Sequence, residues 1–226
     1  MITALRLYIT SKAPLILIAV FALGHVSPVN TQEKLFLSET LLQQVEREHG
    51  QSSRVRLLKW LHLIDHASVE NEKEVLKKVN LFFNQMRFVP DHVQWKQSDY
   101  WATPVEFLAS GAGDCEDFSI AKYITLKTIG IPEEKLAITY VKAIKLNQAH
   151  MVCTYYAYPG AEPLVLDNLT PSILPASKRP DLYPVYTFNG SSLWIAKQRG
   201  KGKNIGHSGR LKKWQNVMHR MTQEFN

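Results

Sequence analysis

The chain has 226 residues, 45% of them hydrophobic, and a formal net charge of +7. This length and composition predict one catalytic domain with a full hydrophobic core and exclude a disordered polar chain, while two cysteines exclude a disulfide-rich scaffold. The positive charge is concentrated near the C-terminus, so it does not indicate a nucleic-acid-binding domain. The basic residues of that segment are Lys197, Arg199, Lys201, Lys203, Arg210, Lys212, Lys213 and Arg220.

The N-terminal residues have the pattern of an export signal. Arg6 and Lys12 precede an apolar run over 13–23, and small residues follow at 22–24. The run is shorter than the ~20 apolar residues that a membrane-spanning helix needs. We therefore predict a signal peptide over 1–26 and a periplasmic location, with an uncleaved N-terminal anchor as the alternative.

Helices are expected next, over 34–49, 53–66 and 71–87. In the last of these, Val75, Val79, Phe82 and Met86 recur at helical spacing and form one apolar stripe. Such stripes are typical of helix faces that pack into a core. Residues 88–105 are rich in aromatics and punctuated by prolines, which predicts a loop.

The following stretch, Gly111-Ala-Gly-Asp-Cys-Glu-Asp-Phe118, leads into a predicted helix over 118–129. Cys115 would lie at the N-terminus of this helix. The helix dipole and the unpaired N–H groups lower the pKa of a thiol there, and the thiolate is the nucleophilic form. Cys115 is therefore a candidate nucleophile, with a buried structural cysteine or a disulfide to Cys153 as the alternative.

The pattern then changes to short β-branched and aromatic stretches separated by turns, which predicts an antiparallel sheet and an α+β fold. The expected strands are 136–143, 149–156, 163–167, 185–188 and 193–196. Residues 27–196 would form the catalytic domain, and 197–226 a basic linker and a C-terminal amphipathic helix. The linker, over 197–209, is expected to be mobile. The helix would either dock on the domain or contact a membrane surface or an acidic partner.

Two polar residues on these strands complete a possible catalytic set. His150 is a candidate general base, and Asp167 is a candidate orienting group for it. Asp167 could also be a turn residue at the end of its strand. Because side chains alternate along a strand, Cys153 would point away from the face of His150.

Four motifs carry a resemblance to a known family: Gly113-Asp-Cys-Glu-Asp117, Ala149-His-Met-Val152, Leu166-Asp-Asn-Leu169 and Asp99-Tyr-Trp-Ala-Thr-Pro104. They resemble the bacterial transglutaminase-like cysteine proteinases of the LapG type, over roughly residues 80–196. The resemblance implies a papain/transglutaminase-like fold, with N-terminal helices and a nucleophile helix packed on an antiparallel sheet. It also implies a triad of Cys115, His150 and Asp167.

The acidic residues beside Cys115 suggest a cation. Asp114, Glu116 and Asp117 would raise the pKa of the thiol, and a hard cation such as Ca²⁺ would relieve this repulsion. LapG-type proteinases are calcium-dependent, with ligands in this run, so the resemblance implies a Ca²⁺ site at these three residues. The alternative is that they interact only with the helix dipole. For the oxyanion, the backbone N–H of Cys115 is one expected donor and Trp95 a candidate second donor.

The resemblance further implies a periplasmic, calcium-dependent endopeptidase. Its substrate would be the N-terminal region of a large adhesin anchored in the outer membrane, and cleavage would release the adhesin and promote biofilm dispersal. An inner-membrane receptor that senses cyclic diguanylate would sequester the enzyme. The alternatives are a transglutaminase or amidase that uses the same triad, and a non-catalytic binding module.

Overall fold

The apolar stripes of the N-terminal half fold as helices. A computed structural model describes residues 36–67, 70–197 and 200–225, so the expected signal peptide or anchor over 1–26 lies outside the described residues. The predicted helices are observed as α1 (Glu39–His49), α2 (Gln51–Ala67) and α3 (Glu72–Phe83). Within the described ranges, no helix combines the length and apolar character that crossing a bilayer would require.

The helix α3 ends earlier than predicted, at Phe83 rather than at residue 87. The chain instead forms β1 (Arg87–Phe88), which pairs in parallel with β2 (Ala112–Gly113). This short pairing brings the region after α3 against the glycine-rich stretch that precedes Cys115.

The segment 88–105, predicted as a loop, contains a short helix, α4 (Asp91–Gln94), and the start of a second, α5 (Pro104–Ser110). The prediction was wrong here, although the sequence has the signal for α5. Thr103 and Glu106 form a reciprocal capping box around Pro104, and Gly111 ends the helix in the left-handed conformation at a φ of 67°.

The helix α6 (Cys115–Ile129) is the central element of the fold. It begins at Cys115, three residues before the predicted start at 118, and its other end is closed by Gly130 in the left-handed region. The helix packs on the sheet strands β3 and β4 and also contacts α2, α3 and α5. Because it is surrounded in this way, α6 is buried on almost every side, including at polar positions such as Lys122 and Thr125, whereas α3 is amphipathic.

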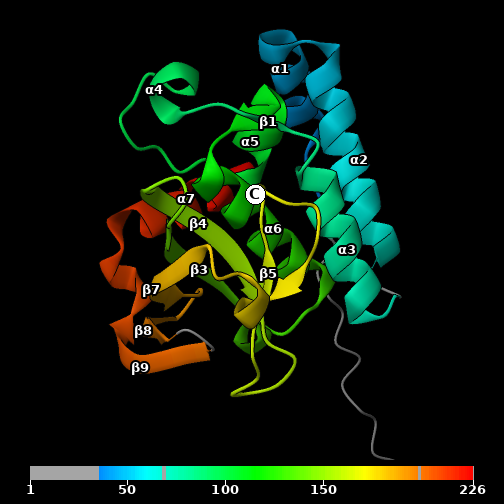
Figure 1. Cartoon of the computed structure of the whole chain (residues 1–226). Helices are drawn as coiled ribbons and strands as arrows, with labels where there is room; N and C mark the ends of the chain where they lie inside the picture. Colours follow the sequence, from blue (N-terminus) through cyan, green and yellow to red (C-terminus); the bar gives the residue numbers. More distant parts are fainter. Residues whose placement is uncertain (1–35, 68–69, 198–199, 226) are drawn as a thin grey trace, which may run out of the picture. The chain divides into compact units, whose positions relative to one another are not determined.

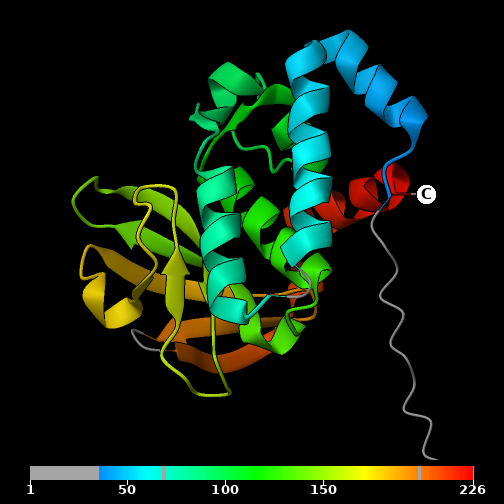
Figure 2. The ribbon, with the colours of Figure 1, turned by 90° about the vertical axis from the view of Figure 1, so that its right-hand side faces the viewer.

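The predicted antiparallel sheet has seven strands in the order β6-β5-β4-β3-β7-β8-β9. Their bounds are β3 Leu136–Ala143, β4 Gln148–Tyr155, β5 Leu164–Leu166, β6 Leu174–Pro175, β7 Leu182–Phe188, β8 Ser192–Lys197 and β9 Gly200–His207. Single-turn 3₁₀ helices lie at Glu133–Lys135, Ala176–Lys178 and Ser208–Arg210. Figures 1 and 2 show helices covering one face of this sheet.

The strand β9 corrects one prediction. The Gly- and Lys-rich stretch 197–209 was expected to be a mobile linker, but its described residues extend the sheet by pairing with β8. Glycine makes this pairing possible at one close approach, because a Cβ on Gly202 would lie 2.0 Å from the backbone oxygen of Ile195. The described residues, including β9 and the last helix, belong to a single packing unit.

Alternation along β4 divides its side chains as predicted. Met151 and Cys153 belong to the main core with α6, whereas Val152 packs with Val141 and Val165 in a smaller cluster. Cys153 is fully buried, and both cysteines are free thiols. The alternative of a disulfide between Cys115 and Cys153 is therefore wrong.

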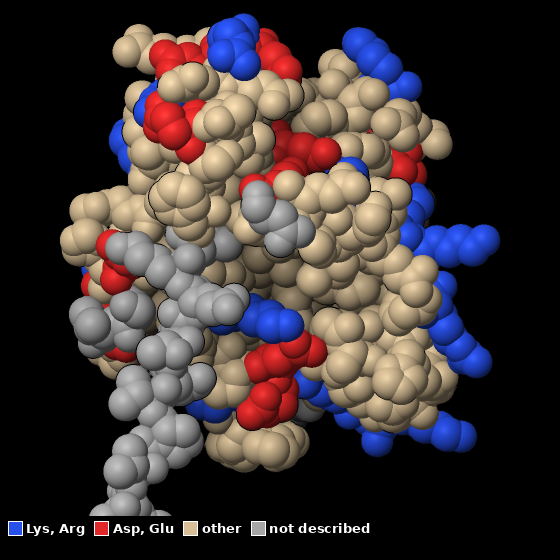
Figure 3. Space-filling view, turned by 180° about the vertical axis from the view of Figure 1, so that it is seen from behind, with Lys and Arg blue, Asp and Glu red and all other residues tan. Residues whose placement is uncertain are grey.

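The C-terminal helix α7 (Lys212–Glu224) docks on this core through its apolar face. Trp214 is 2% exposed and packs edge to face against Tyr123 and Phe188, with ring centroids 5.6 and 5.5 Å apart. Lys212 and Lys213 are exposed. Figure 3 shows basic side chains projecting along the edge where Figure 1 places β9 and α7. Of the predicted alternatives, the structure therefore shows the C-terminal helix docked on the domain, with its lysines at the surface.

We expect Trp214→Ala to lower the free energy of unfolding by about 3–5 kcal/mol, because it leaves a cavity beneath α7. Gln215→Ala, at an exposed position of the same helix, is the matched control and should change the stability by less than about 0.5 kcal/mol. Urea unfolding measures both. Equal, small effects would show that α7 does not contribute to the core.

Candidate active site

The position of Cys115 depends on the turn before it. A Cβ on Gly113 would lie 2.2 Å from Oδ2 of Asp117, so only glycine allows the close approach of that carboxylate to the backbone. Oδ2 of Asp117 also accepts a hydrogen bond from the Asp114 N–H at 3.3 Å. These contacts hold the turn against the first turn of α6, with Cys115 as the first residue of the helix.

The thiol of Cys115 is partly buried and contacts two groups. It donates to Oε2 of Glu116 at 2.7 Å, and it has a hydrogen bond with the backbone of Met151, the residue after His150. Burial raises the pKa of Cys115 well above its usual value, and the negative charge of Glu116 raises it further. Among the described residues, the sulfur of Cys115 therefore contacts Glu116 and Met151 and has no hydrogen bond with His150.

His150 and Asp167 form a buried pair, as the resemblance implied. The Nε2–H of His150 donates to Oδ1 of Asp167 at 2.8 Å, and the two residues are 2% and 1% exposed. Engagement of Nε2 leaves Nδ1 as the ring nitrogen available to a thiol. Since Met151 on the same strand contacts the sulfur of Cys115, the structure brings all three predicted catalytic residues to one end of β4.

Asp167 is built to remain ionised. Burial alone would raise its pKa, but hydrogen bonds from His150, Leu169 N–H and Arg179 lower it to about 2. Arg179 was not predicted from the sequence, since an isolated arginine in a loop has no motif that connects it with Asp167. Only the fold shows that the two side chains meet.

Hydrogen bonds from Asn84, at the end of α3, hold the chain segment that follows β5. Nδ2 of Asn84 donates to the backbone oxygens of Asp167 and Thr170, at 2.9 and 3.3 Å. Its Oδ1 accepts from Nζ of Lys122 at 2.7 Å. Lys122 is fully buried in α6, so this network joins the end of α3, the middle of α6 and the backbone of Asp167.

The predicted acidic run forms part of a larger carboxylate cluster. Asp91 of α4 and Asp99 lie with it, and three overlapping groups have their side-chain ligand atoms within 4.8 Å of one another. These groups are Asp114 with Cys115 and Glu116, Asp91 with Asp114 and Asp117, and Asp91 with Asp99 and Glu116. Asp91 was not predicted from the sequence. Asp99 belongs to the motif 99–104 of the resemblance but was not predicted as a ligand, because only the fold shows that it approaches the acidic run.

Donors satisfy the cluster only in part: Tyr100 N–H donates to Oδ2 of Asp91, and Lys213 pairs with Asp99. Oδ1 of Asp91 and Oδ1 of Asp114 are buried and have no hydrogen-bond partner among the described residues. Burial, followed by the charges of Glu116, Asp117 and Asp91, raises the pKa of Asp114 to about 10. Converging carboxylate oxygens without donors are the environment that a hard cation such as Ca²⁺ requires, so these residues fit such an ion.

Asp117 differs from the other members of the cluster. Its Oδ1 accepts from Ala102 N–H at 2.8 Å, and its Oδ2 accepts from the indole N–H of Trp95 at 3.2 Å. Burial nevertheless raises its pKa to about 8. In this structure Asp117 therefore anchors the segment 95–102, and the indole N–H of Trp95, the candidate second oxyanion donor, is already engaged.

Comparison with known proteins agrees with this arrangement. Residues 61–196 match the family described as bacterial transglutaminase-like cysteine proteinase. No curated protein sequence matches the chain.

Solved structures of LapG from Legionella pneumophila are also similar. The EGTA-treated form is 44% identical, with a TM-score of 0.72, and the match covers 83% of this chain and 99% of that one. The calcium-bound form is 45% identical, with a TM-score of 0.69, and the match covers 80% of this chain and 97% of that one. The predicted resemblance and fold class are thereby confirmed.

The buried Lys122 gives a prediction about pH. Burial lowers its pKa to about 7, so between pH 7 and about 10 the folded state binds fewer protons than the unfolded chain. The contribution of Lys122 to stability should therefore rise with pH through this window. Relative to Lys122→Met, wild type should gain up to about 1.4 kcal/mol per pH unit, measured by urea unfolding from pH 7 to 10. A constant difference would mean that Lys122 stays charged in the core.

Proposed function

Since this chain belongs to the bacterial transglutaminase-like cysteine proteinases, we propose that it is a calcium-dependent cysteine endopeptidase. Cys115 is the nucleophile, His150 the general base and acid, and Asp167 the orienting group. The observation that carries the proposal is the buried His150–Asp167 hydrogen bond beside the cysteine at the start of α6. A surface histidine would have neither a buried carboxylate partner nor a nearby thiol.

The geometry supports the usual roles of the three residues of a thiol triad. Nδ1 of His150 takes the proton of Cys115, and the thiolate attacks the peptide carbonyl carbon. The same imidazolium gives its proton to the leaving amine, which leaves a thioester on Cys115. His150 then removes a proton from water, and hydrolysis of the thioester restores the thiol. Asp167 keeps the ring oriented and stabilises the imidazolium throughout.

Stabilisation of the oxyanion comes from the start of α6. The backbone N–H of Cys115 lies in the first turn, where N–H groups have no partner within the helix and the dipole favours negative charge. Such preorganised donors are worth ~3 kcal/mol each when they face the developing charge.

We propose that Asp91, Asp114 and Glu116 hold Ca²⁺, with Asp117 behind them. The bound ion would supply positive charge that offsets their mutual repulsion. Glu116 is central, because its Oε2 accepts the thiol proton of Cys115 in this structure. A glutamate engaged as a ligand would be less available to the thiol, which would then be free to bond with His150.

Substrate, location and partners rest on the family resemblance. We propose that the enzyme acts in the periplasm on the N-terminal region of a large outer-membrane-anchored adhesin, releases it and promotes biofilm dispersal. We also propose that an inner-membrane receptor for cyclic diguanylate sequesters the enzyme. The basic and apolar residues over 6–23 support export.

The proposed activity is tested with an N-terminal fragment of a large adhesin from the same genome. Wild type in CaCl₂ should cut the fragment, and both EGTA and Cys115→Ala should abolish cutting. Asp167→Asn should lower kcat by roughly 10²–10⁴-fold, because the histidine loses its orienting carboxylate. Cutting by Cys115→Ala would contradict the triad.

The matched control is Cys153→Ala, which removes the other thiol without touching the proposed site. It should cut like wild type when folded. Incorporation of an amine into a glutamine substrate, without cutting, would replace the endopeptidase by a transglutaminase.

The carboxylate cluster gives a separate prediction about stability. In EGTA, Asp114→Asn should raise the free energy of unfolding by about 1 kcal/mol, or the melting temperature by ~2–4 °C, because the neutral amide avoids both the repulsion of a charged Asp114 and the cost of protonating it on folding. Adding CaCl₂ should stabilise wild type more than the variant. Asp181→Asn, a carboxylate outside the cluster, should leave the response to calcium unchanged. Equal responses of all three proteins would contradict the ion site.

A further inference from the structure

The carboxylate of Asp167 is shared between two cationic or proton-donating side chains. Oδ1 accepts from His150 at 2.8 Å and from Leu169 N–H at 3.1 Å. Oδ2 accepts from Nη2 of Arg179 at 2.7 Å. One oxygen is therefore committed to the imidazole and the other to the guanidinium, and rotation of the carboxylate would break both contacts.

Arg179 is itself held in place. Its Nε and Nη2 donate to the two oxygens of Asp181 at 3.0 and 2.8 Å, and its backbone N–H donates to Ala176 O. Arg179 is 6% exposed, whereas the side chain of Asp181 is 30% exposed. The rigid fork of a guanidinium thus connects a partly solvated carboxylate with a buried one.

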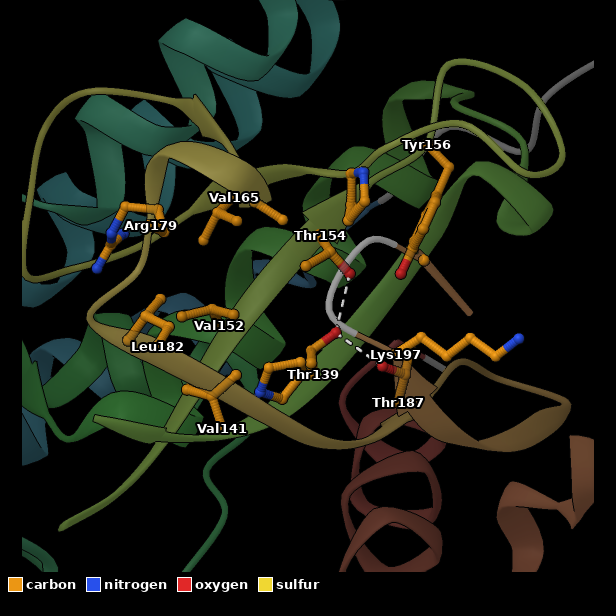
Figure 4. A pocket seen from close by; sticks show the side chains of 14 residues that line it. Thr139, Val141, Val152, Thr154, Tyr156, Val165, Arg179, Leu182, Thr187 and Lys197 are labelled. Atoms are coloured by element: carbon orange, nitrogen blue, oxygen red, sulfur yellow. Dashed lines mark hydrogen bonds between the residues drawn. The ribbon is translucent and has the colours of Figure 1, made fainter. Parts of the chain in front are cut away.

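The surroundings of Arg179 are mostly apolar. Its side chain lines a cavity on the sheet together with Leu182 and the small cluster of Val141, Val152 and Val165. Figure 4 shows its guanidinium pointing away from the hydroxyl groups that gather at the other end of this cavity. Those hydroxyls bond to one another across Thr139, so they do not compete for the arginine.

We propose that Arg179 is a positioning residue of the triad, which fixes the Asp167 carboxylate so that Oδ1 stays on Nε2 of His150. The proposal rests on the function proposed above. Arg179 lies in the segment between β6 and β7, which contributes no group to the reacting atoms. In this proposal that segment nevertheless controls the orientation of the base, His150.

The electrostatic reason is the burial of Asp167. Without the guanidinium, Oδ2 would be a buried anionic oxygen with no donor, which costs several kcal/mol unless the group takes up a proton. A protonated Asp167 is a poorer acceptor for His150 and stabilises an imidazolium less. The bond from Arg179 is among the causes that keep the pKa of Asp167 low despite its burial.

The kinetic test compares Arg179→Met with Asp181→Asn. The methionine fills the volume of the side chain without its charge, whereas Asp181→Asn removes the outer partner and keeps the Arg179–Asp167 bond. We expect Arg179→Met to lower kcat by about 10²-fold with KM within about threefold, because the base is misplaced while substrate contacts remain. The acidic limb of its kcat/KM profile should move to higher pH. Asp181→Asn should retain kcat within about threefold.

A second readout does not depend on proteolysis. The proton shared by His150 and Asp167 should give a downfield ¹H resonance in the wild-type NMR spectrum, retained in Asp181→Asn and lost or shifted in Arg179→Met. If wild type cuts nothing, the proposed function fails and the resonance alone decides the role of Arg179. If Arg179→Met does not fold, Arg179→Lys replaces it, with a shifted resonance and a kcat lowered about 3–10-fold.

Two results would overturn the proposal. One is a wild-type resonance and kcat in folded Arg179→Met, or in Arg179→Lys where that variant replaces it. The other is an equal loss of kcat in Asp181→Asn and Arg179→Met that follows their loss of unfolding free energy, which would make Arg179 a purely structural residue.

Discussion

The packing of α6 against β3 and β4 determines the geometry of the site. The helix contributes Cys115 at its first turn, and β4 contributes His150, so the distance between the proposed nucleophile and the proposed base is set by how the two elements pack. Side chains along the buried face of β4, including Met151 and Cys153, interlock with the helix. A close-packed contact of this kind has few alternative arrangements, which is what a catalytic pair requires.

The site places two kinds of carboxylate close together. Asp167 has a donor on each oxygen and is stable as an anion in the core. Asp91 and Asp114 each have a buried oxygen without a donor among the described residues. Asp167 finds partners for both of its oxygens within the protein. The unpartnered oxygens of the cluster would find a partner only in the cation that we propose. In the function proposed above, this difference lets one site combine a histidine that is always oriented by Asp167 with a carboxylate cluster that responds to calcium.

The sequence was informative where the periodicity was strong or the motif local. The stripe of Val75 and Val79 predicted α3, and alternation along β4 predicted that Cys153 points into the core. Local pattern could not locate Asp91 or Arg179, because both reach the site only through tertiary contacts. The strand β9 was missed because its glycines and lysines have low strand propensity, and pairing with β8 overrides that preference.

The C-terminal helix and the acidic cluster share one segment of chain. Arg220 of α7 donates to Trp101 O and to Tyr100, while the N–H groups of Tyr100 and Ala102 donate to Asp91 and Asp117. A ligand that displaced α7 would therefore disturb the hydrogen bonds of two carboxylates. Thermodynamic linkage is reciprocal, so a cation bound at those carboxylates would change the affinity of that ligand by the same factor. The helix α7 is in this sense thermodynamically coupled to the proposed cation site.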